Sequence, residues 1–80
     1  MATFLLHHRH KADECAASFA AWKGFRSPLR RSPAHSTCLA GGHALWWIVE
    51  AADGDAALAL LPAFVARRSA ATEVRRVQIP

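Results

Sequence analysis

Residues 43–51, HALWWIVEA, alternate between two rows of side chains, and this pattern decides the fold that we predict. Alternation with a period of two is typical of a β-strand that buries one of its faces. We expect the uniformly apolar row to face the protein core; its members are Leu45, Trp47, Val49 and Ala51. The opposite row should lie on the uncovered face of the sheet; it consists of Trp46, Ile48 and Glu50.

The segments around this strand show where the other elements should lie. Gly41-Gly42 is a strong signal for a two-residue hairpin, so a preceding strand is expected to start at residue 37. Two stretches with apolar residues at helical spacing are predicted as helices, and Pro62 should kink or break the second one. The predicted strands cover residues 3–9 and 72–79 and the hairpin 37–51, and the predicted helices cover residues 12–24 and 53–68.

The resulting order, β–α–β–β–α–β, is that of the split βαβ, or ferredoxin-like, arrangement. We therefore predict a single α+β domain over residues 1–80, with a four-stranded antiparallel sheet in the order 4-1-3-2 and two helices on one face. The other face would expose aromatic and aliphatic side chains to water. The composition makes such exposure hard to avoid in a small domain, since 52% of the 80 residues are hydrophobic and three are tryptophan. A homodimer with two sheets packed face to face would cover that face.

Charge and cysteine content narrow the expected partners. The formal net charge is +4, but the basic residues are scattered, and the chain lacks the glycine–aromatic pattern of RNA-recognition sheets, so we expect no nucleic-acid partner. No apolar run is long enough for a membrane span, and no secretory signal pattern is present. The two cysteines form no C-x-x-C pair. We therefore expect a cytoplasmic protein with reduced thiols and no membrane partner.

The chain resembles the dimeric α+β barrel superfamily, and within it small bacterial domains of unknown function. The similarity covers the whole chain and rests on element order and short local features; these are the Gly-Gly hairpin, WWIVEA, DGDAALALL and the final VQIP. The resemblance implies a homodimer with a ligand cleft between sheet and helices. The superfamily includes cofactor-free monooxygenases, so we expect no cofactor. Because its members carry out different reactions, the resemblance does not identify one.

Two histidines are candidates for acid–base or oxygenase-type chemistry in such a cleft. A histidine of ordinary pKa is a natural proton acceptor near neutral pH, and we assign this role to His7 or His8. An apolar or aromatic small molecule is the expected ligand; its predicted contacts are Trp46, Ile48, Glu50, Arg9 and Arg30. Arg30 belongs to the loop RSPLRRSP, whose guanidinium groups could hold a carboxylate or a phosphate.

A metal-binding module is the alternative function. His8 and His10 lie two residues apart on one side of the first strand, and an antiparallel third strand would bring His43 to the same end. Imidazoles in this arrangement could bind zinc or nickel. The spacing matches no closed zinc motif, so a structural role for the histidines and an interaction protein without catalysis both stay open. Cys15 is expected on the apolar face of the first helix as an inert thiol.

Overall fold

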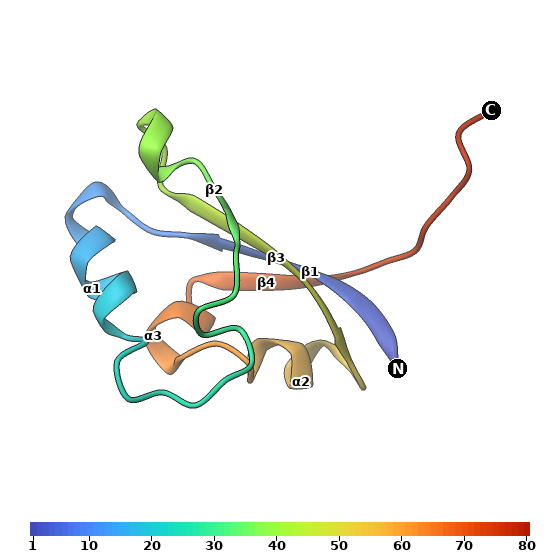
Figure 1. The fold of residues 1–80 in the computed structure, drawn as a ribbon, viewed down its shortest axis with the longest axis horizontal. Helices are drawn as coiled ribbons and strands as arrows, with labels where there is room; N and C mark the ends of the chain where they lie inside the picture. Colours follow the sequence, from blue (N-terminus) through green and yellow to red (C-terminus); the bar gives the residue numbers. More distant parts are fainter.

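The computed structural model describes all residues from 1 to 80 of the protein. The chain forms one sheet with short helices packed against it (Figure 1). The four strands are β1 (Ala2–Arg9), β2 (His35–Ser36), β3 (Ala44–Ala51) and β4 (Ser69–Val74). The helices are α1 (Cys15–Ala20), α2 (Gly54–Leu58) and α3 (Ala63–Ala66), and 3₁₀ turns cover Ala12–Glu14 and Cys38–Ala40. No helix has both the length and the apolar character that crossing a bilayer would require.

All neighbouring strands of the sheet are antiparallel, and their order is β2-β3-β1-β4. Read from the opposite edge, this is β4-β1-β3-β2, with β1 and β3 in the centre. The prediction of an α+β domain with a four-stranded antiparallel sheet is therefore confirmed. Leu6 in β1 pairs with Trp47 of β3 on one side and with Ala71 of β4 on the other, so it lies in the middle of the sheet.

One face of the sheet, called the covered face here, carries the hydrophobic core. Leu6 and Trp47 are buried on it against Leu61 and Val65 from the helical segments. Trp22, which follows α1, packs on the same face, with its ring centroid 5.9 Å from that of Trp47. The helical segments therefore cover this face, as the uniformly apolar row of β3 predicts.

The opposite face, called the open face here, has no helix over it (Figure 1). It carries the second row of β3, and Ile48 in the middle of that row is 71% exposed. Leu5, which pairs with Ile48 across the β1–β3 ladder, lies on the same face and is half-buried. The alternation of β3 thus predicts correctly which of its side chains face the core.

The first helix is shorter than the sequence predicts. The helix expected over residues 12–24 is a 3₁₀ turn followed by the six residues of α1, and the chain then turns through Gly24 with φ at +75°. Trp22 packs between Trp47 and Phe25, with ring centroids 5.9 and 6.2 Å away. These tertiary contacts replace the last helical turn that the periodicity predicts.

The second predicted helix is broken near Pro62, as expected. α2 ends at Leu58, and Pro62 lies directly before α3, where its missing backbone donor is tolerated. The carboxylate of Asp53 caps α2 by accepting a hydrogen bond from the N–H of Ala56 at 2.8 Å. After α3 the chain enters β4 earlier than predicted and leaves it at Val74.

The turn before β3 is wider than the predicted two-residue hairpin. β2 contains only two residues, and the connection to β3 includes a 3₁₀ turn that ends at Gly41 with φ at +87°. The carbonyl of Thr37 accepts a hydrogen bond from the N–H of Gly42 at 2.8 Å. A Cβ at Gly42 would clash with the Thr37 side chain, so only glycine permits this approach. The loop therefore fixes the position of His43 at the start of β3.

Candidate metal centre

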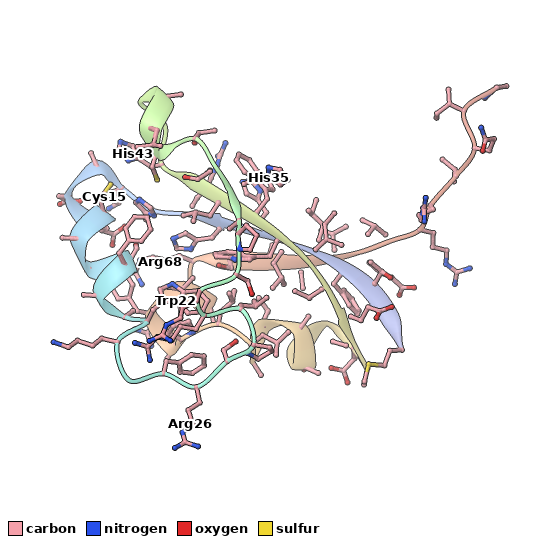
Figure 2. All side chains as sticks on the ribbon, viewed as in Figure 1. Cys15, Trp22, Arg26, His35, His43 and Arg68 are labelled. Carbon is pink, nitrogen blue, oxygen red and sulfur yellow. The ribbon has the colours of Figure 1, made fainter.

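Three side chains that can bind metal converge at one end of the sheet, where β1 ends and β3 begins. Cys15 Sγ lies 3.2 Å from His10 Nε2 and 3.1 Å from His43 Nδ1. These three atoms all lie within 4.8 Å of one another. Figure 2 shows Cys15 and His43 close together at the beginning of α1. The cluster therefore joins residues from three separate segments of the chain.

The backbone beyond β1 sets the position of His10. Its N–H donates to the carbonyl of His43 at 3.0 Å, which keeps the two residues side by side just past the β1–β3 ladder. The chain then reverses in the first 3₁₀ turn, where the Glu14 carboxylate accepts a hydrogen bond from the N–H of Lys11 at 2.9 Å. This reversal brings Cys15, the first residue of α1, back to His10.

An ion pair holds this turn against the C-terminal part of the domain. Arg68 Nε and Nη2 lie 3.0 and 2.9 Å from Glu14 Oε2, and the same guanidinium lies 3.6 Å from the centroid of the Phe64 ring. The N–H of Lys11 and the Arg68 side chain both lower the pKa of Glu14, because they stabilise the charged carboxylate. At neutral pH the carboxylate is therefore ionised, and the turn stays attached to Arg68, two residues after the end of α3.

His8 supports His10 through the ring nitrogen that does not face Cys15. Its side chain is fully buried, and its Nε2 lies 2.9 Å from Nδ1 of His10. Its other nitrogen, Nδ1, faces the carbonyl of Val65 at 3.3 Å and Oγ of Ser69 at 3.1 Å. Burial lowers the pKa of His8, because the charged imidazolium would lose its hydration. His8 is therefore neutral at physiological pH.

These contacts determine which ring nitrogens carry protons. The Val65 carbonyl can only accept, so His8 Nδ1 carries the proton and His8 Nε2 is free to accept. His10 Nδ1–H then donates to His8, and His10 Nε2 keeps its lone pair on the side of Cys15. Metal-binding histidines usually donate their second N–H in this way, which orients the ring and raises its basicity.

The two N···S distances of the cluster are close to those of a zinc site. Zn–N bonds of about 2.0–2.1 Å and Zn–S bonds of about 2.3 Å give a tetrahedral site N···S edges of about 3.6 Å. The two observed N···S distances, 3.2 and 3.1 Å, are a little shorter than this edge, and the two ring nitrogens lie within 4.8 Å of each other. Small side-chain rotations would open the N···S distances to the metal-bound values. His10 is buried, whereas Cys15 and His43 are half-buried, so the cluster reaches the protein surface.

The structure brings together two of the three histidines predicted as metal ligands. His10 and His43 belong to the cluster, whereas His8 contacts His10 and occupies the supporting position. Cys15 is the third member, although the sequence pattern places it on the apolar face of a helix as an inert thiol. The expected placement requires correction, because Phe19, four residues after Cys15 and therefore on the same helix face, is 55% exposed and Ser18 is buried instead. The helix is rotated, and this rotation directs Cys15 to the histidines.

The two acid–base candidates do not share a site, because His7 and His8 point to opposite faces of β1. His7 stacks on Trp46 on the open face, with ring centroids 5.0 Å apart and the planes 10° from parallel, and its buried Nε2 has no hydrogen-bond partner. Ile48 and Glu50, two of the predicted ligand contacts, are exposed farther along that face.

An apolar cleft of about 520 Å³ lies on the covered face and is separate from the cluster. Trp47 of β3 and Trp22 form part of its wall, and Arg30 and Arg31 border it. Arg30 therefore lies where a ligand in this cleft would meet a cation. Arg9 borders a different cavity beside the metal cluster, and the other predicted ligand contacts, on the open face, do not line the cleft.

The sequence indicates only weakly that Cys15 lies beside the histidines. In HRHKADEC, a cysteine follows two alternating histidines of a strand end after a short acidic segment. The cysteine can reach the histidines only if the chain reverses within the intervening residues. Glu14, which accepts the hydrogen bond from the Lys11 N–H, is the residue that promotes this reversal. An acidic residue before a helix start is too common to identify such a turn by itself.

Comparison with known proteins found no matching family, no matching curated protein and no matching solved structure. The resemblance to the dimeric α+β barrel superfamily is therefore supported only by the α+β class and the antiparallel four-stranded sheet. Chemical information about function has to come from the side chains that the fold brings together.

Proposed function

We propose that the protein is a metal-binding module that holds a transition metal ion, such as Zn²⁺, through His10 Nε2, Cys15 Sγ and His43 Nδ1. The observation that carries this proposal is the convergence of these three atoms within 4.8 Å from three separate segments. Thiolate sulfur and imidazole nitrogen are both among the donors that Zn²⁺ binds in proteins. The buried hydrogen bond from His10 to His8 supplies the outer support that such ligands usually have.

The presence of two imidazoles favours a metal site over thiol catalysis. A catalytic cysteine needs one histidine as base and a third group to orient it, and His10 with His8 would meet that requirement. His43 at 3.1 Å from the same sulfur has no role in that scheme. A metal ion uses all three donors. We propose that the protein works in a reducing cytoplasm, which would keep Cys15 available as a thiolate.

Metal content and thermal stability test the proposal directly. Protein produced without a histidine tag and loaded with Zn²⁺ should retain one equivalent after gel filtration, as determined by elemental analysis. Removing the ion with a strong chelator should lower the melting temperature, because a ligand that binds only the folded state stabilises it. Substoichiometric zinc together with an unchanged melting temperature would end the proposal.

The apolar cleft supports a second candidate function, the binding of an aromatic carboxylate. Trp22 and Trp47 offer flat apolar walls in a space of about 520 Å³, a size typical of small-molecule sites. Arg30 and Arg31 border it and form no ion pair with any acidic residue. Arg31 also holds a φ of +69°, a strained backbone conformation for a residue other than glycine. Strained residues of this kind concentrate at functional sites.

Replacing Arg31 with glycine separates ligand binding from folding at this cleft. Glycine relieves the strained φ but makes the unfolded chain more flexible, so stability should stay unchanged or rise by up to about 1 kcal/mol. The affinity for 2-naphthoate should fall by about tenfold, since a charge-assisted contact is lost. Calorimetric titration and urea denaturation measure the two effects, with neutral 2-naphthamide as the matched ligand. Equal binding of acid and amide to the native protein would rule this function out.

A homodimer with a ferredoxin-like subunit is also part of our proposal. The exposed Ile48, the half-buried Leu5 and the His7–Trp46 stack give the open face an apolar and aromatic character that supports pairing with a second sheet. Sedimentation equilibrium should then give twice the mass of the chain, and Ile48→Glu should give the mass of a single chain. A native protein that sediments as a monomer at high concentration contradicts this.

A further inference from the structure

We propose that the metal centre keeps one coordination position open and binds a small carboxylate there, beside Arg9. This inference rests on the proposed metal binding and adds the class of ligand that the metal would take. It follows from three features of the same end of the sheet: the number of protein donors, a cavity whose lining includes His10 and His43, and a cation in that cavity without an acidic partner.

The number of donors leaves the coordination shell incomplete. Across residues 1–80, the cluster contains three residues that could ligate a metal, and no fourth histidine, cysteine, aspartate or glutamate joins them. His8, the nearest further imidazole, is engaged with Nδ1 of His10 and with the carbonyl of Val65. Zinc sites with three protein ligands characteristically hold water or substrate in the fourth position, whereas structural sites have four protein ligands. The protein therefore has the donor set of an open site.

A cavity lies beside the two imidazole ligands. It has a volume of about 370 Å³, and His10 and His43 both contribute to its lining together with Arg9 and Trp46. Cys15 does not line it. An exogenous ligand that completed the shell from this side would approach between the two imidazoles. The volume suits a small molecule, and the Trp46 ring provides an apolar surface for its non-polar part.

The charge of the cavity selects an anion. Arg9 is exposed at the end of β1 and forms no ion pair, because the two ion pairs of the structure use Arg68 and Arg75. The guanidinium is permanently charged, and its planar fork matches a carboxylate. The same arginine also borders a second recess of about 580 Å³, whose lining includes Lys11, Arg67 and the Glu14–Arg68 ion pair, so the charge around this recess is positive overall. A carboxylate that reached the metal through this cavity would therefore enter a space that Arg9 also lines.

Cobalt spectroscopy tests this inference without any assumption about activity. Co²⁺ bound through Cys15 should give a thiolate charge-transfer band and visible d–d bands. Titration with acetate should shift the d–d bands to saturation, whereas acetamide should not. Arg9→Gln should weaken acetate binding by about fivefold, the most that one exposed ion pair usually contributes. Arg67→Gln, a nearby cation outside this cavity, should change it less than twofold.

The outcomes separate this inference from the proposed metal function. If Co²⁺ binds with the thiolate band but acetate leaves the d–d bands unchanged, the metal function stands and the open site is wrong. If acetate shifts the bands equally in the native protein and in Arg9→Gln, Arg9 has no part in binding. If no thiolate band forms at all, the metal function itself fails. The affinity of both arginine variants for Co²⁺ should remain within about twofold of the native value, because neither side chain is a donor to the metal.

Discussion

Replacing Cys15 with serine is expected to weaken the binding of Zn²⁺ or Co²⁺ by about 300-fold. Metal-binding free energies of about 10–16 kcal/mol in small zinc domains are shared among three or four ligands, so one ligand corresponds to about 3–4 kcal/mol. The serine hydroxyl is not ionised at neutral pH and cannot replace the thiolate. The thiolate charge-transfer band of the Co²⁺ form should disappear, and competition with a chelating dye gives the affinity.

Cys38→Ser is the matched control for this experiment. Cys38 is the only other cysteine, is half-buried, and lines the apolar cleft instead of contacting a histidine. This variant should retain the native metal affinity and the charge-transfer band. The metal-free Cys15→Ser protein should still fold, because a hydroxyl can make the hydrogen bonds that the thiol makes to His10 and His43. If both cysteine variants bind metal like the native protein, the three-residue centre is wrong.

The second large effect is expected in the core, where Leu6→Ala should lower the free energy of unfolding by about 2–5 kcal/mol. Leu6 is completely buried and pairs with Trp47 and Ala71 in the two neighbouring strands. Neighbours held by two hydrogen-bonded ladders cannot collapse into the cavity that the smaller side chain leaves. An 80-residue domain has a total stability of about 4–12 kcal/mol, so this single substitution removes a large part of it.

Urea denaturation followed by tryptophan fluorescence measures this loss. Leu39→Ala is the matched control, because Leu39 is fully exposed and its truncation removes no core contact. Its unfolding midpoint should remain within experimental error of the native value. If the two variants unfold at the same urea concentration, then β1 is not the centre of the core, and the arrangement of the sheet described above is incorrect.

The central strands could be predicted from the sequence because their alternation reports directly on burial. In β3, the order of Leu45, Trp46, Trp47 and Ile48 matches the alternation of buried and more exposed side chains. The helices could not be predicted as well, because their ends depend on contacts distant in sequence. α1 ends early where Trp22 packs on Trp47, and no local pattern records that contact.

The candidate site was predictable only where it depends on strand topology. His10 and His43 meet because β1 and β3 are antiparallel neighbours, and the order of elements alone implies this. Cys15 could not be assigned, because its direction depends on the rotation of a short helix about its axis. That rotation follows from the 3₁₀ turn at Ala12–Glu14 and from the burial of Ser18. The helical periodicity covers thirteen expected positions, which is about three and a half turns. A rotation confined to one of these turns does not change that overall pattern.

The three donors also have a consequence for local opening of the folded chain. Cys15 and His43 are 28 residues apart in sequence, and the segment between them contains the long proline- and arginine-rich connection. A metal ion that binds only the folded state would have to be released before this segment could detach from the sheet, so binding would add its free energy to the cost of that opening. Loss of the ion would therefore make this segment easier for proteases to cut, whereas the β1–β4 pairing, which contains none of the three donors, would be affected less.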